Sequence, residues 1–401
     1  MTAPHAGLRV LELARILAGP WLGQTLADLG ADVVKVESAE GDDTRIWGPP
    51  FVKDEAGQEL DAAYYHACNR GKRSVVLDFR TAEGQEAVRR LAARSDVLIE
   101  NFKTGGLAKY GLDYESLSKV NPRLIYCSVT GFGQQGPYAQ RAGYDYIIQG
   151  MGGIMDLTGE PEREPQKIGV AFADLFTGLY GTIAVQAALA EREVSGKGQW
   201  IDMALLDCMT GVLANQAMNY LVSGTAPRRM GNAHPNVTPY QVMQAADGPF
   251  VIAAGNDAQF RRFCSLLGEA AMGLDPRFAT NKARLANRQA LTEALEALTR
   301  QRPRDALLAE LAAAGVPAGP INRVDQVFAD PQVRSRGMQV ELPTSGVAGG
   351  MMSYVRNPIR FSRTGLAMER GAPLKGEHTA EVLAEIGLAG PAEETAEETK
   401  E

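Results

Sequence analysis

The fold is decided between residues 8 and 37, which read Leu8-Arg-Val-Leu-Glu-Leu-Ala-Arg-Ile-Leu-Ala-Gly-Pro-Trp-Leu-Gly-Gln-Thr-Leu-Ala-Asp-Leu-Gly-Ala-Asp-Val-Val-Lys-Val-Glu37. Both ends, Leu8–Leu13 and Ala31–Glu37, are rich in branched residues and predict strands. Between them lies a turn, followed by a helical segment, Trp21–Leu29, that stops at Gly30. A strand, a helix and a strand at this spacing form a βαβ unit. The unit predicts a parallel sheet whose ligand crevice lies at the carboxyl ends of its strands.

The same alternation continues through the first half of the chain. Strands are predicted at 74–79, 96–102, 124–130 and 199–204, and helices at 81–93, where Thr81 is a candidate cap, 114–120 and 207–221. The first turn does not match G-x-G-x-x-G, because Gly19 and Gly23 are four residues apart. A nicotinamide dinucleotide site is therefore a poor fit.

The amino-acid composition changes at Ser223–Asn236. This segment is rich in glycine, proline and arginine, which is typical of a domain edge. A chain of 401 residues is long for one core, so two domains are expected. The smaller, helix-richer domain is predicted at 223–325. Residues 391–401 are charged, acidic and of low complexity, and they predict a disordered tail.

Composition excludes several classes of protein. Hydrophobic residues make up 45% of the chain, charged residues make up 22%, and the net charge is −7, which is typical of a soluble globular protein and does not suggest nucleic-acid binding. No secretory signal and no apolar span long enough to cross a bilayer is expected. The four cysteines and four histidines are scattered, so we expect free thiols, a reducing cytoplasmic compartment and no metal site.

One carboxylate stands out, Asp174 in Gly169-Val-Ala-Phe-Ala-Asp-Leu-Phe-Thr-Gly-Leu-Tyr-Gly181. It opens an apolar run, Leu175–Leu189, of helical length. A carboxylate at the positive end of a helix dipole is expected to stay ionised and to have a fixed direction. Asp174 is therefore either a helix cap or a nucleophile, and the local pattern leaves both interpretations open.

Several stretches, in order along the chain, resemble one family. They are Leu11-Glu-Leu13 with Ala18-Gly-Pro20, Asp28-Leu-Gly-Ala-Asp-Val-Val-Lys-Val-Glu37, Gly41-Asp-Asp-Thr-Arg45, Asn69-Arg-Gly-Lys-Arg-Ser74, Glu100-Asn-Phe102, Ser128-Val-Thr-Gly-Phe-Gly133, Ala173-Asp174 and Gly196-Lys-Gly198. Over residues 7–388 the chain is similar to the class III CoA-transferases of the CaiB/BaiF, or formyl-CoA transferase, type. Within that family it resembles most the dicarboxylate transferases of the glutarate, malate and itaconate type. The stretches that indicate this are Gly41–Arg45 continuing into Trp47-Gly-Pro-Pro-Phe51, Ala142-Gly-Tyr-Asp145, Pro239-Tyr-Gln241 and Gly319-Pro-Ile-Asn322.

The resemblance implies an α/β fold with a Rossmann-like, doubly wound large domain and a smaller α+β domain. Residues 1–222 would form the first part of the large, CoA-binding domain, and 326–390 would return to it. Two chains would interlock into a homodimer. Acyl-CoA and a small carboxylic acid are the implied partners, with no nucleic acid, no membrane and no permanently bound cofactor.

The resemblance implies chemistry that moves CoA from an acyl-CoA donor, with succinyl-CoA expected in this family branch, to a free dicarboxylic acid. The aspartate that matches Asp174 forms an aspartyl–acyl anhydride and then an aspartyl–CoA thioester. Water has to be kept out, because anhydrides hydrolyse. Oxyanion donors are expected from a loop that includes Gly231, Asn232 and His234. Formyl-CoA transferases have a longer glycine run there, which argues against formyl or oxalate chemistry in this chain.

Other residues carry over from the same resemblance. Tyr144 would contact the substrate carbonyl. Contacts to CoA are expected from Ile16, Leu17, Ala18, Leu77, Arg80, Asn101, Phe102, Lys109 and Arg141. Some members have arginine where this chain has Ser38, so one CoA contact would be missing. Arg45, or else Arg73, would bind the distal carboxylate of the acceptor, because a planar guanidinium matches a carboxylate. Alternatively, Arg45 pairs with Asp42 or Asp43 as a structural clamp.

Two other functions stay open. An acyl-CoA racemase needs a general acid and base on opposite faces of the α-carbon, and racemases of this fold carry histidine where this chain has Tyr144. A phenol with an ordinary pKa of about 10 replaces histidine poorly. A non-catalytic CoA-binding protein would have lost its nucleophile, which the presence of Asp174 opposes. Asp145 either orients neighbouring groups or caps the next helix.

Overall fold

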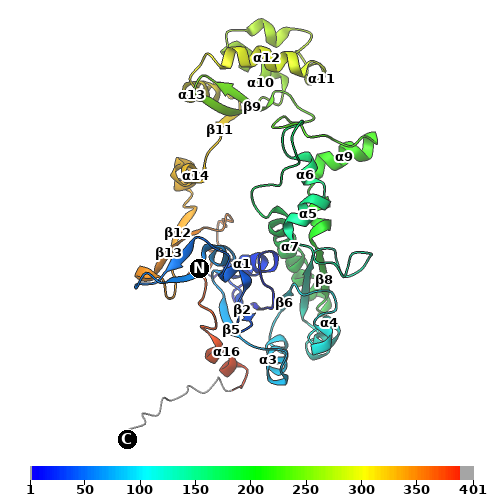
Figure 1. Ribbon diagram of the computed structural model, residues 1–401, viewed down its shortest axis with the longest axis vertical. Helices are drawn as coiled ribbons and strands as arrows, with labels where there is room; N and C mark the ends of the chain where they lie inside the picture. The colour runs from blue at the N-terminus through cyan, green and yellow to red at the C-terminus, as the bar shows by residue number, and fades with distance from the viewer. Residues whose placement is uncertain (1, 389–401) are drawn as a thin grey trace. The chain divides into compact units, whose positions relative to one another are not determined.

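The computed structural model describes residues 2–388, so the predicted tail at 391–401 lies outside the described residues. The chain divides into two compact units (Figure 1). The first contains the described residues up to Gly153, Ile168–Ala217 and the described residues from Arg334 onward. The second contains Ile154–Lys167 and Met218–Val333.

A six-stranded parallel sheet forms the centre of the first unit, as the sequence predicts. Its strands are β1 (Arg9–Glu12), β2 (Asp32–Glu37), β5 (Arg73–Val76), β6 (Val97–Glu100), β7 (Ile125–Thr130) and β8 (Trp200–Ala204). Their order is β5-β2-β1-β6-β7-β8. Counted along the chain, this is the 3-2-1-4-5-6 order of a Rossmann-like sheet. The order reverses between β1 and β6, where a ligand crevice is expected.

Helices cover both faces of this sheet. On one face, α3 (Ala82–Ala93), α4 (Tyr114–Val120) and α16 (Thr379–Glu385) share a core with alternate strand residues such as Leu11 and Leu98. The opposite face carries α1 (Ala18–Asp28), where a Cβ on Gly19 would lie 3.6 Å from Cγ2 of Ile99. The alternation of strand side chains between two helical layers makes the sheet doubly wound.

The helix that carries Asp174, α7 (Phe172–Ser195), packs tightly against α1. A Cβ on Gly178 would lie 2.8 Å from the carbonyl oxygen of Ala18, and one on Gly181 would lie 2.5 Å from Cδ1 of Leu22. Glycine is therefore required at 178, where a side chain would meet the α1 backbone, whereas a side chain at 181 would displace the end of the Leu22 side chain.

The ends of two helices test the sequence predictions directly. Thr81 caps α3 as predicted, since its hydroxyl accepts from the Gly84 N–H at 3.1 Å. The single helix predicted at 207–221 is wrong. The chain forms α8 (Leu205–Gly211) and α9 (Ala214–Ser223) instead, because Ala214 adopts φ 47° in the left-handed region and breaks the helix.

By length and composition, α7 is long and apolar enough to span a membrane, and within residues 2–388 it is the one helix that is. This corrects the expectation that the chain has no such span. The core helix of a soluble protein meets the same criterion, and α7 packs along α1, α5, α8, β7 and β8. Length and composition therefore do not distinguish the two cases.

The second unit is a small α+β domain. Its three-stranded antiparallel sheet has the order β11-β10-β9 and consists of β9 (Tyr240–Ala245), β10 (Gly248–Ala253) and β11 (Ala318–Pro320). The helices α10 (Asp257–Leu266), α12 (Arg288–Thr299) and α13 (Arg304–Ala313) share a core with this sheet. The predicted segment 223–325 lies inside this unit, and 154–167, which the sequence did not suggest, belongs to it as well.

The remaining elements are shorter. They are β3 (Phe51–Lys53), β4 (Glu59–Ala62), α2 (Ala63–Asn69), α5 (Asp145–Met151), α6 (Ile154–Leu157), α11 (Asn281–Ala286), α14 (Val324–Ala329), α15 (Pro331–Ser335), β12 (Gln339–Pro343) and β13 (Met351–Val355), with four short 3-10 turns at Asp43–Arg45, Ala108–Tyr110, Ala270–Leu274 and Ala348–Gly350. The chain rejoins the first unit at Arg334, where the resemblance placed the return at 326. The rejoining segment contributes the β12–β13 hairpin and α16, which packs against β5.

Candidate active site

A pocket of about 580 Å³ opens within the first unit, at the carboxyl ends of β1 and β6 where the strand order reverses. Asp174 and Tyr144 both line it. So do all nine residues for which the resemblance implies CoA contacts, namely Ile16, Leu17, Ala18, Leu77, Arg80, Asn101, Phe102, Lys109 and Arg141. Segments far apart in the sequence therefore converge on one cavity, as expected at a switch point of a doubly wound sheet.

The turn after β1 is held in a strained conformation. Ile16 has φ 74°, a left-handed value that costs free energy for a β-branched residue. Its N–H donates to the carboxylate of Asp42 at 3.2 Å, and its carbonyl accepts from the Cys68 thiol at 3.4 Å. Burial alone would raise the pKa of the Asp42 carboxyl, but Lys35, 2.8 Å away, and Thr44 outweigh it and bring the pKa to about 2. An ionised carboxylate thus fixes the backbone that faces the pocket.

The loops after β1 and β6 are joined to each other. Asn101 accepts from the Arg15 N–H at 3.0 Å and donates to the Arg15 carbonyl at 2.6 Å. Beside this joint, the Phe79 ring meets the rings of Phe102 and Tyr110 edge to face, with both centroid distances 5.6 Å. These aromatic side chains give one end of the pocket a surface on which a flat, apolar base can rest.

Basic side chains line the same end of the pocket. Arg80 forms a two-point ion pair with Asp78, with N–O distances of 2.8 and 2.9 Å. Lys109 lies over the ring of Tyr110, and Arg141 lies 4.5 Å from the ring centroid of Tyr138. Positive charge beside an aromatic surface suits a ligand that carries both phosphate groups and a base.

Asp174 lies at the inner end of this pocket and is only 9% exposed. Burial raises the pKa of its carboxyl to about 7, and the negative charge of Asp145 adds to the rise. This corrects the expectation that the carboxylate simply stays ionised at a helix N-terminus, because burial makes its protonation easier than that of an ordinary aspartate.

Asp174 is not the cap of α7 either. The helix begins at Phe172, which makes Asp174 its third residue, and Ala171 occupies the cap position without a side-chain bond. The carboxylate of Asp145, on α5, accepts from the N–H groups of Ala173 at 2.8 Å and Asp174 at 3.4 Å. The capping interpretation of Asp174 is therefore wrong, and its side chain is left for another role.

Tyr144 immediately precedes α5, and its side chain lines the pocket while 54% of it is exposed. The hydroxyl of a half-exposed tyrosine can donate a hydrogen bond to a ligand carbonyl. Whether it contacts the substrate carbonyl stays a prediction.

The sequence profile of CoA-transferase family III matches residues 6–379. The chain belongs to this family. It is accordingly a class III CoA-transferase, an enzyme that uses CoA thioesters as substrates.

Individual relatives agree with this assignment. The chain is 58% identical over 384 residues to the succinate–glutarate CoA-transferase of Agrobacterium fabrum, covering 96% of both proteins. It is 39% identical to the succinyl-CoA:glutarate CoA-transferase of Homo sapiens, over 96% of this chain and 86% of that protein. Among solved structures, it is similar to a CaiB/BaiF family protein from Brucella suis, with a TM-score of 0.85, 65% identity, and coverage of 96% of this chain and 100% of that one.

The two arginines expected to bind a dicarboxylate in this CoA-transferase do not line the pocket. Arg45 is buried and bonded to both oxygens of Glu37, at 2.6 and 2.8 Å, and it also pairs with Asp61. Its role is the structural clamp considered as an alternative, although its partners are not Asp42 or Asp43.

Arg73 is bound elsewhere in a similar way. Its guanidinium pairs with Asp32, Glu381 and Glu385, which ties β5 to β2 and α16. The assignment of Arg45 or Arg73 to the acceptor is thus corrected, since both guanidinium groups are already held by carboxylates of this chain.

Asn232 and His234 belong to the second unit. The His234 ring packs against Tyr240 at a centroid distance of 5.1 Å, and its Nδ1 accepts from the Asn236 N–H at 3.1 Å. The His234 carbonyl accepts from Arg288 at 2.8 Å. These contacts hold the loop in a defined shape within its own unit, and its part in the reaction stays a prediction.

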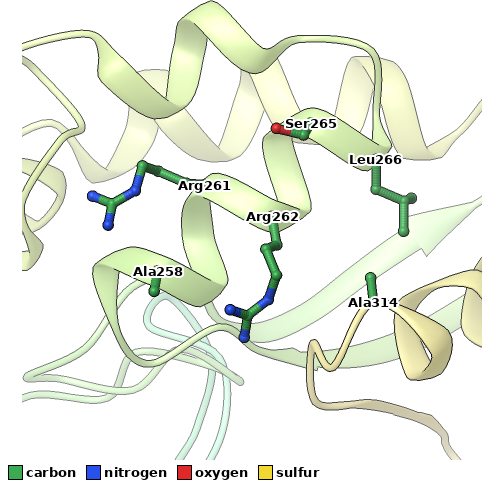
Figure 2. Close-up of a pocket in the computed structure, with 6 residues that line it drawn as sticks. All are labelled: Ala258, Arg261, Arg262, Ser265, Leu266 and Ala314. Carbon is green, nitrogen blue, oxygen red and sulfur yellow. The ribbon is translucent and has the colours of Figure 1, made fainter.

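A second pocket, of about 620 Å³, lies on the surface of the second unit. It is lined by Ala258, Arg261, Arg262, Ser265, Leu266 and Ala314. Figure 2 shows the guanidinium groups of Arg261 and Arg262 pointing in different directions, and Arg262 donates to the Gly315 carbonyl at 3.1 Å. They do not converge on one ligand, and none of the predicted site residues lies here.

Two further chemical features bear on the site. Among residues 2–388, no group of three or more histidine, cysteine, aspartate or glutamate side chains is placed to hold a metal ion. All four cysteines, Cys68, Cys127, Cys208 and Cys264, are free and buried.

Sequence reasoning missed two elements of the site. Asp42 was considered only as a partner for Arg45, whereas it holds the Ile16 turn. The capping role offered for Asp145 is found at α7, whereas its partner Gln149 was missed, although the i, i+4 spacing of Asp145 and Gln149 was a visible indication of a polar pair.

Proposed function

We propose that the protein moves CoA from succinyl-CoA to a free dicarboxylic acid such as glutarate. The succinate–glutarate and succinyl-CoA:glutarate enzymes to which it is similar support this choice of substrates. One observation carries the proposal. A single buried carboxyl, Asp174, lies in the same pocket as the nine residues at which CoA contacts are expected.

In the first half of the proposed reaction, an Asp174 oxygen attacks the thioester carbonyl of the donor. The carbon–sulfur bond breaks, CoA leaves as a thiolate, and an aspartyl–acyl anhydride forms. The thiolate then attacks the aspartyl carbonyl, which releases the donor's acid as a carboxylate and leaves an aspartyl–CoA thioester.

In the second half, the carboxylate of the acceptor attacks this thioester and forms a second anhydride with release of CoA thiolate. The thiolate attacks the acyl carbon of the acceptor, the new acyl-CoA leaves, and Asp174 is restored as a carboxylate. Each covalent intermediate is an activated carbonyl that water would destroy, so the low exposure of Asp174 serves the reaction.

The raised pKa of Asp174 fits a nucleophile. A carboxylate with few solvating partners is held at higher free energy than one in water, and acylation removes its charge from the buried site. The pocket thus favours the covalent intermediates over the resting anion. A racemase gains no support from the structure, because Tyr144 stands where racemases of this fold carry histidine and its side chain is half exposed.

We propose further that the enzyme is an interlocked cytoplasmic homodimer. Large apolar side chains are exposed along the outer face of α7, at Leu179, Tyr180 and Ile183, and on α5, at Tyr146 and Ile147. Exposed apolar residues gathered on neighbouring helices mark a surface that another chain covers. The free, buried thiols suit a reducing compartment. Sedimentation of the purified enzyme tests the oligomeric state, and a monomer at micromolar concentration would refute it.

A single-turnover experiment tests the mechanism. The enzyme is mixed with succinyl-CoA in the absence of acceptor and quenched with hydroxylamine or borohydride, and peptides are analysed by mass spectrometry. Hydroxamate or reduced aspartate is expected at Asp174, and no label is expected in Asp174→Ala. Label at another residue, or full activity of Asp174→Ala, would end the proposal.

A panel of acids tests the acceptor. Succinyl-CoA is offered with oxalate, malonate, glutarate, adipate and the monocarboxylate butyrate, and new acyl-CoA species are followed by mass spectrometry. Glutaryl-CoA is expected to form at least about tenfold faster than butyryl-CoA, since recognition of a second carboxylate by charge-assisted hydrogen bonds is worth about 1.5–3 kcal/mol. Equal rates for glutarate and butyrate contradict dicarboxylate selectivity without touching the Asp174 mechanism.

A further inference from the structure

A carboxylate from one helix caps another helix next to the reactive residue. Asp145 is the first residue of α5, and it accepts from the N–H groups of Ala173 and Asp174 at the start of α7. These donors are among those that a helix N-terminus leaves without an intrahelical partner. They are therefore unavailable to the side chain of Asp174, which keeps its charge uncompensated.

The orientation of Asp145 is set by Gln149, one turn further along α5. The Gln149 side chain is fully buried, and its amide donates to the second Asp145 oxygen at 2.8 Å and to the Val170 carbonyl at 3.2 Å. The same amide accepts from the Ile168 N–H at 2.9 Å. Asp145 and Gln149 together form what we call the α5 clamp, which fixes both the segment entering α7 and the first turn of that helix.

The α5 clamp also places a negative charge beside the nucleophile. Asp145 raises the pKa of Asp174, and this adds to the effect of burial. Other ionisable groups around Asp174 do not offset this rise in its pKa. Tyr64, on α2, is itself raised in pKa by burial and then by the charge of Asp174, and Cys208, on α8, is buried with a raised pKa and is bonded to Thr177. No cation opposes Asp145 there among the described residues that act on Asp174.

We propose that Asp145 is a positioning residue for the transferase reaction, which fixes the direction of the Asp174 carboxylate and, through its charge, keeps that carboxylate basic and nucleophilic. The inference rests on the proposed role of Asp174 as nucleophile. Geometry carries it, since one Asp145 oxygen faces the α7 backbone and the other is held by Gln149. A more basic carboxylate is a stronger nucleophile once ionised, so the neighbouring charge lowers the ionised fraction but raises the reactivity of what is ionised.

Two variants separate the two effects. Asp145→Asn keeps an oxygen that can accept from the Ala173 N–H but removes the charge. Gln149→Met keeps the shape of the side chain and the charge of Asp145 but removes the bonds that orient Asp145. The matched control is Asp207→Asn, which removes an exposed carboxylate from the first turn of the neighbouring helix α8.

The measurement is kcat/KM for succinyl-CoA between pH 5.5 and 9, with kcat and KM determined separately. Asp145→Asn is expected to lower the pH midpoint by about 1 unit and to lower kcat on the alkaline plateau several-fold. Gln149→Met is expected to leave the midpoint within about 0.3 units and to lower kcat roughly tenfold with little change in KM. Asp207→Asn is expected to change neither.

An unchanged or raised midpoint in Asp145→Asn overturns the inference, as does an unchanged kcat in Gln149→Met. Circular dichroism identifies variants that do not fold, and Asp145→Ser, which keeps an acceptor for Ala173, replaces Asp145→Asn under the same criteria in that case. Asp174→Ala is measured alongside. Activity retained in Asp174→Ala refutes the proposed function, whereas loss of activity there with no shift in Asp145→Asn refutes only the role of the α5 clamp.

Discussion

Two buried aspartates of the first unit have opposite electrostatics: Asp42 holds the Ile16 turn, and Asp174 lines the pocket. Asp42 has a lysine 2.8 Å away and accepts from three backbone or side-chain donors of Ile16 and Thr44, so its pKa falls to about 2. Asp174 has no such cation, so burial, with the charge of Asp145 added to it, raises the pKa of its carboxyl to about 7. Because both carboxyls are buried, the difference between their pKa values comes from their partners. We expect those partners to separate a structural carboxyl from a reactive one.

The largest effect is expected from removing the carboxyl of Asp174. Asp174→Asn is expected to lower kcat by roughly 10⁴-fold or more, because an amide does not form an anhydride and the neighbouring Asp145 carboxylate is held by Ala173 and Gln149 and does not line the pocket. Steady-state turnover of succinyl-CoA with glutarate measures it. A loss smaller than about tenfold would place the chemistry on another residue.

Removing the carboxyl of Asp42 should lower the free energy of unfolding. Asp42→Ala leaves Lys35 in a buried cluster with one positive charge too many and is expected to cost about 3–5 kcal/mol of unfolding free energy at pH 7. Since the folded pKa is depressed, this stabilisation is complete above about pH 4 and disappears as the pH falls toward 2.

Urea denaturation at pH 7 provides the measurement for Asp42→Ala. Asp43→Asn is the matched control, because Asp43 forms an exposed ion pair with Arg15 and should cost less than about 1 kcal/mol. Equal losses in the two variants would mean that the buried cluster does not hold the turn.

Ionisation of the Asp174 carboxyl should lower the free energy of unfolding. The pKa of Asp174 is higher in the folded chain than the ordinary 3.8, so its ionisation opposes folding. The penalty is absent below about pH 4, grows as the pH rises, and is complete above about pH 7. Asp174→Asn is therefore expected to be more stable than the parent by about 2–4 kcal/mol at pH 8 and by little at pH 4. Denaturant midpoints of both proteins at the two pH values measure this difference. A gain in unfolding free energy that does not depend on pH would contradict the raised pKa of Asp174.

The smallest effect expected is the pH profile of the parent enzyme. Because the nucleophile has to be ionised, kcat/KM for the acyl-CoA should rise about tenfold per pH unit below a midpoint near 7 and level off above it. A profile that is flat between pH 5 and 8 would show that Asp174 is ionised in the free enzyme, as Asp42 is.

The sequence predicted local features well. The parallel sheet followed from branched strands at a regular spacing, and Thr81 was identified as a cap because the contact that it makes spans three residues. The pocket residues came from resemblance to a family, and the structure brings them to one pocket, while their contacts to CoA stay a prediction. These predictions depend on short-range pattern or on whole-chain similarity.

Long-range polar contacts could not be predicted. Arg73 could have faced a ligand, but it is bound by Glu381 and Glu385, more than 300 residues away. Asp145 and Ala173 are 28 residues apart and meet only because α5 and α7 pack together. The choice among several carboxylates for one cation is made by tertiary packing, which a single sequence does not reveal.

The two glycines of α7 have a further consequence. Since Gly178 and Gly181 bring the α7 backbone against α1, the reactive carboxyl and the turn that precedes α1 are carried by what is in effect one rigid block. In the proposed reaction, this block would set the same distance between the Asp174 oxygen and the bound thioester in every variant that keeps the contact between α1 and α7. A change in the preferred acceptor acid is therefore expected from substitutions away from α1 and α7, which leave the geometry of the reacting groups unchanged.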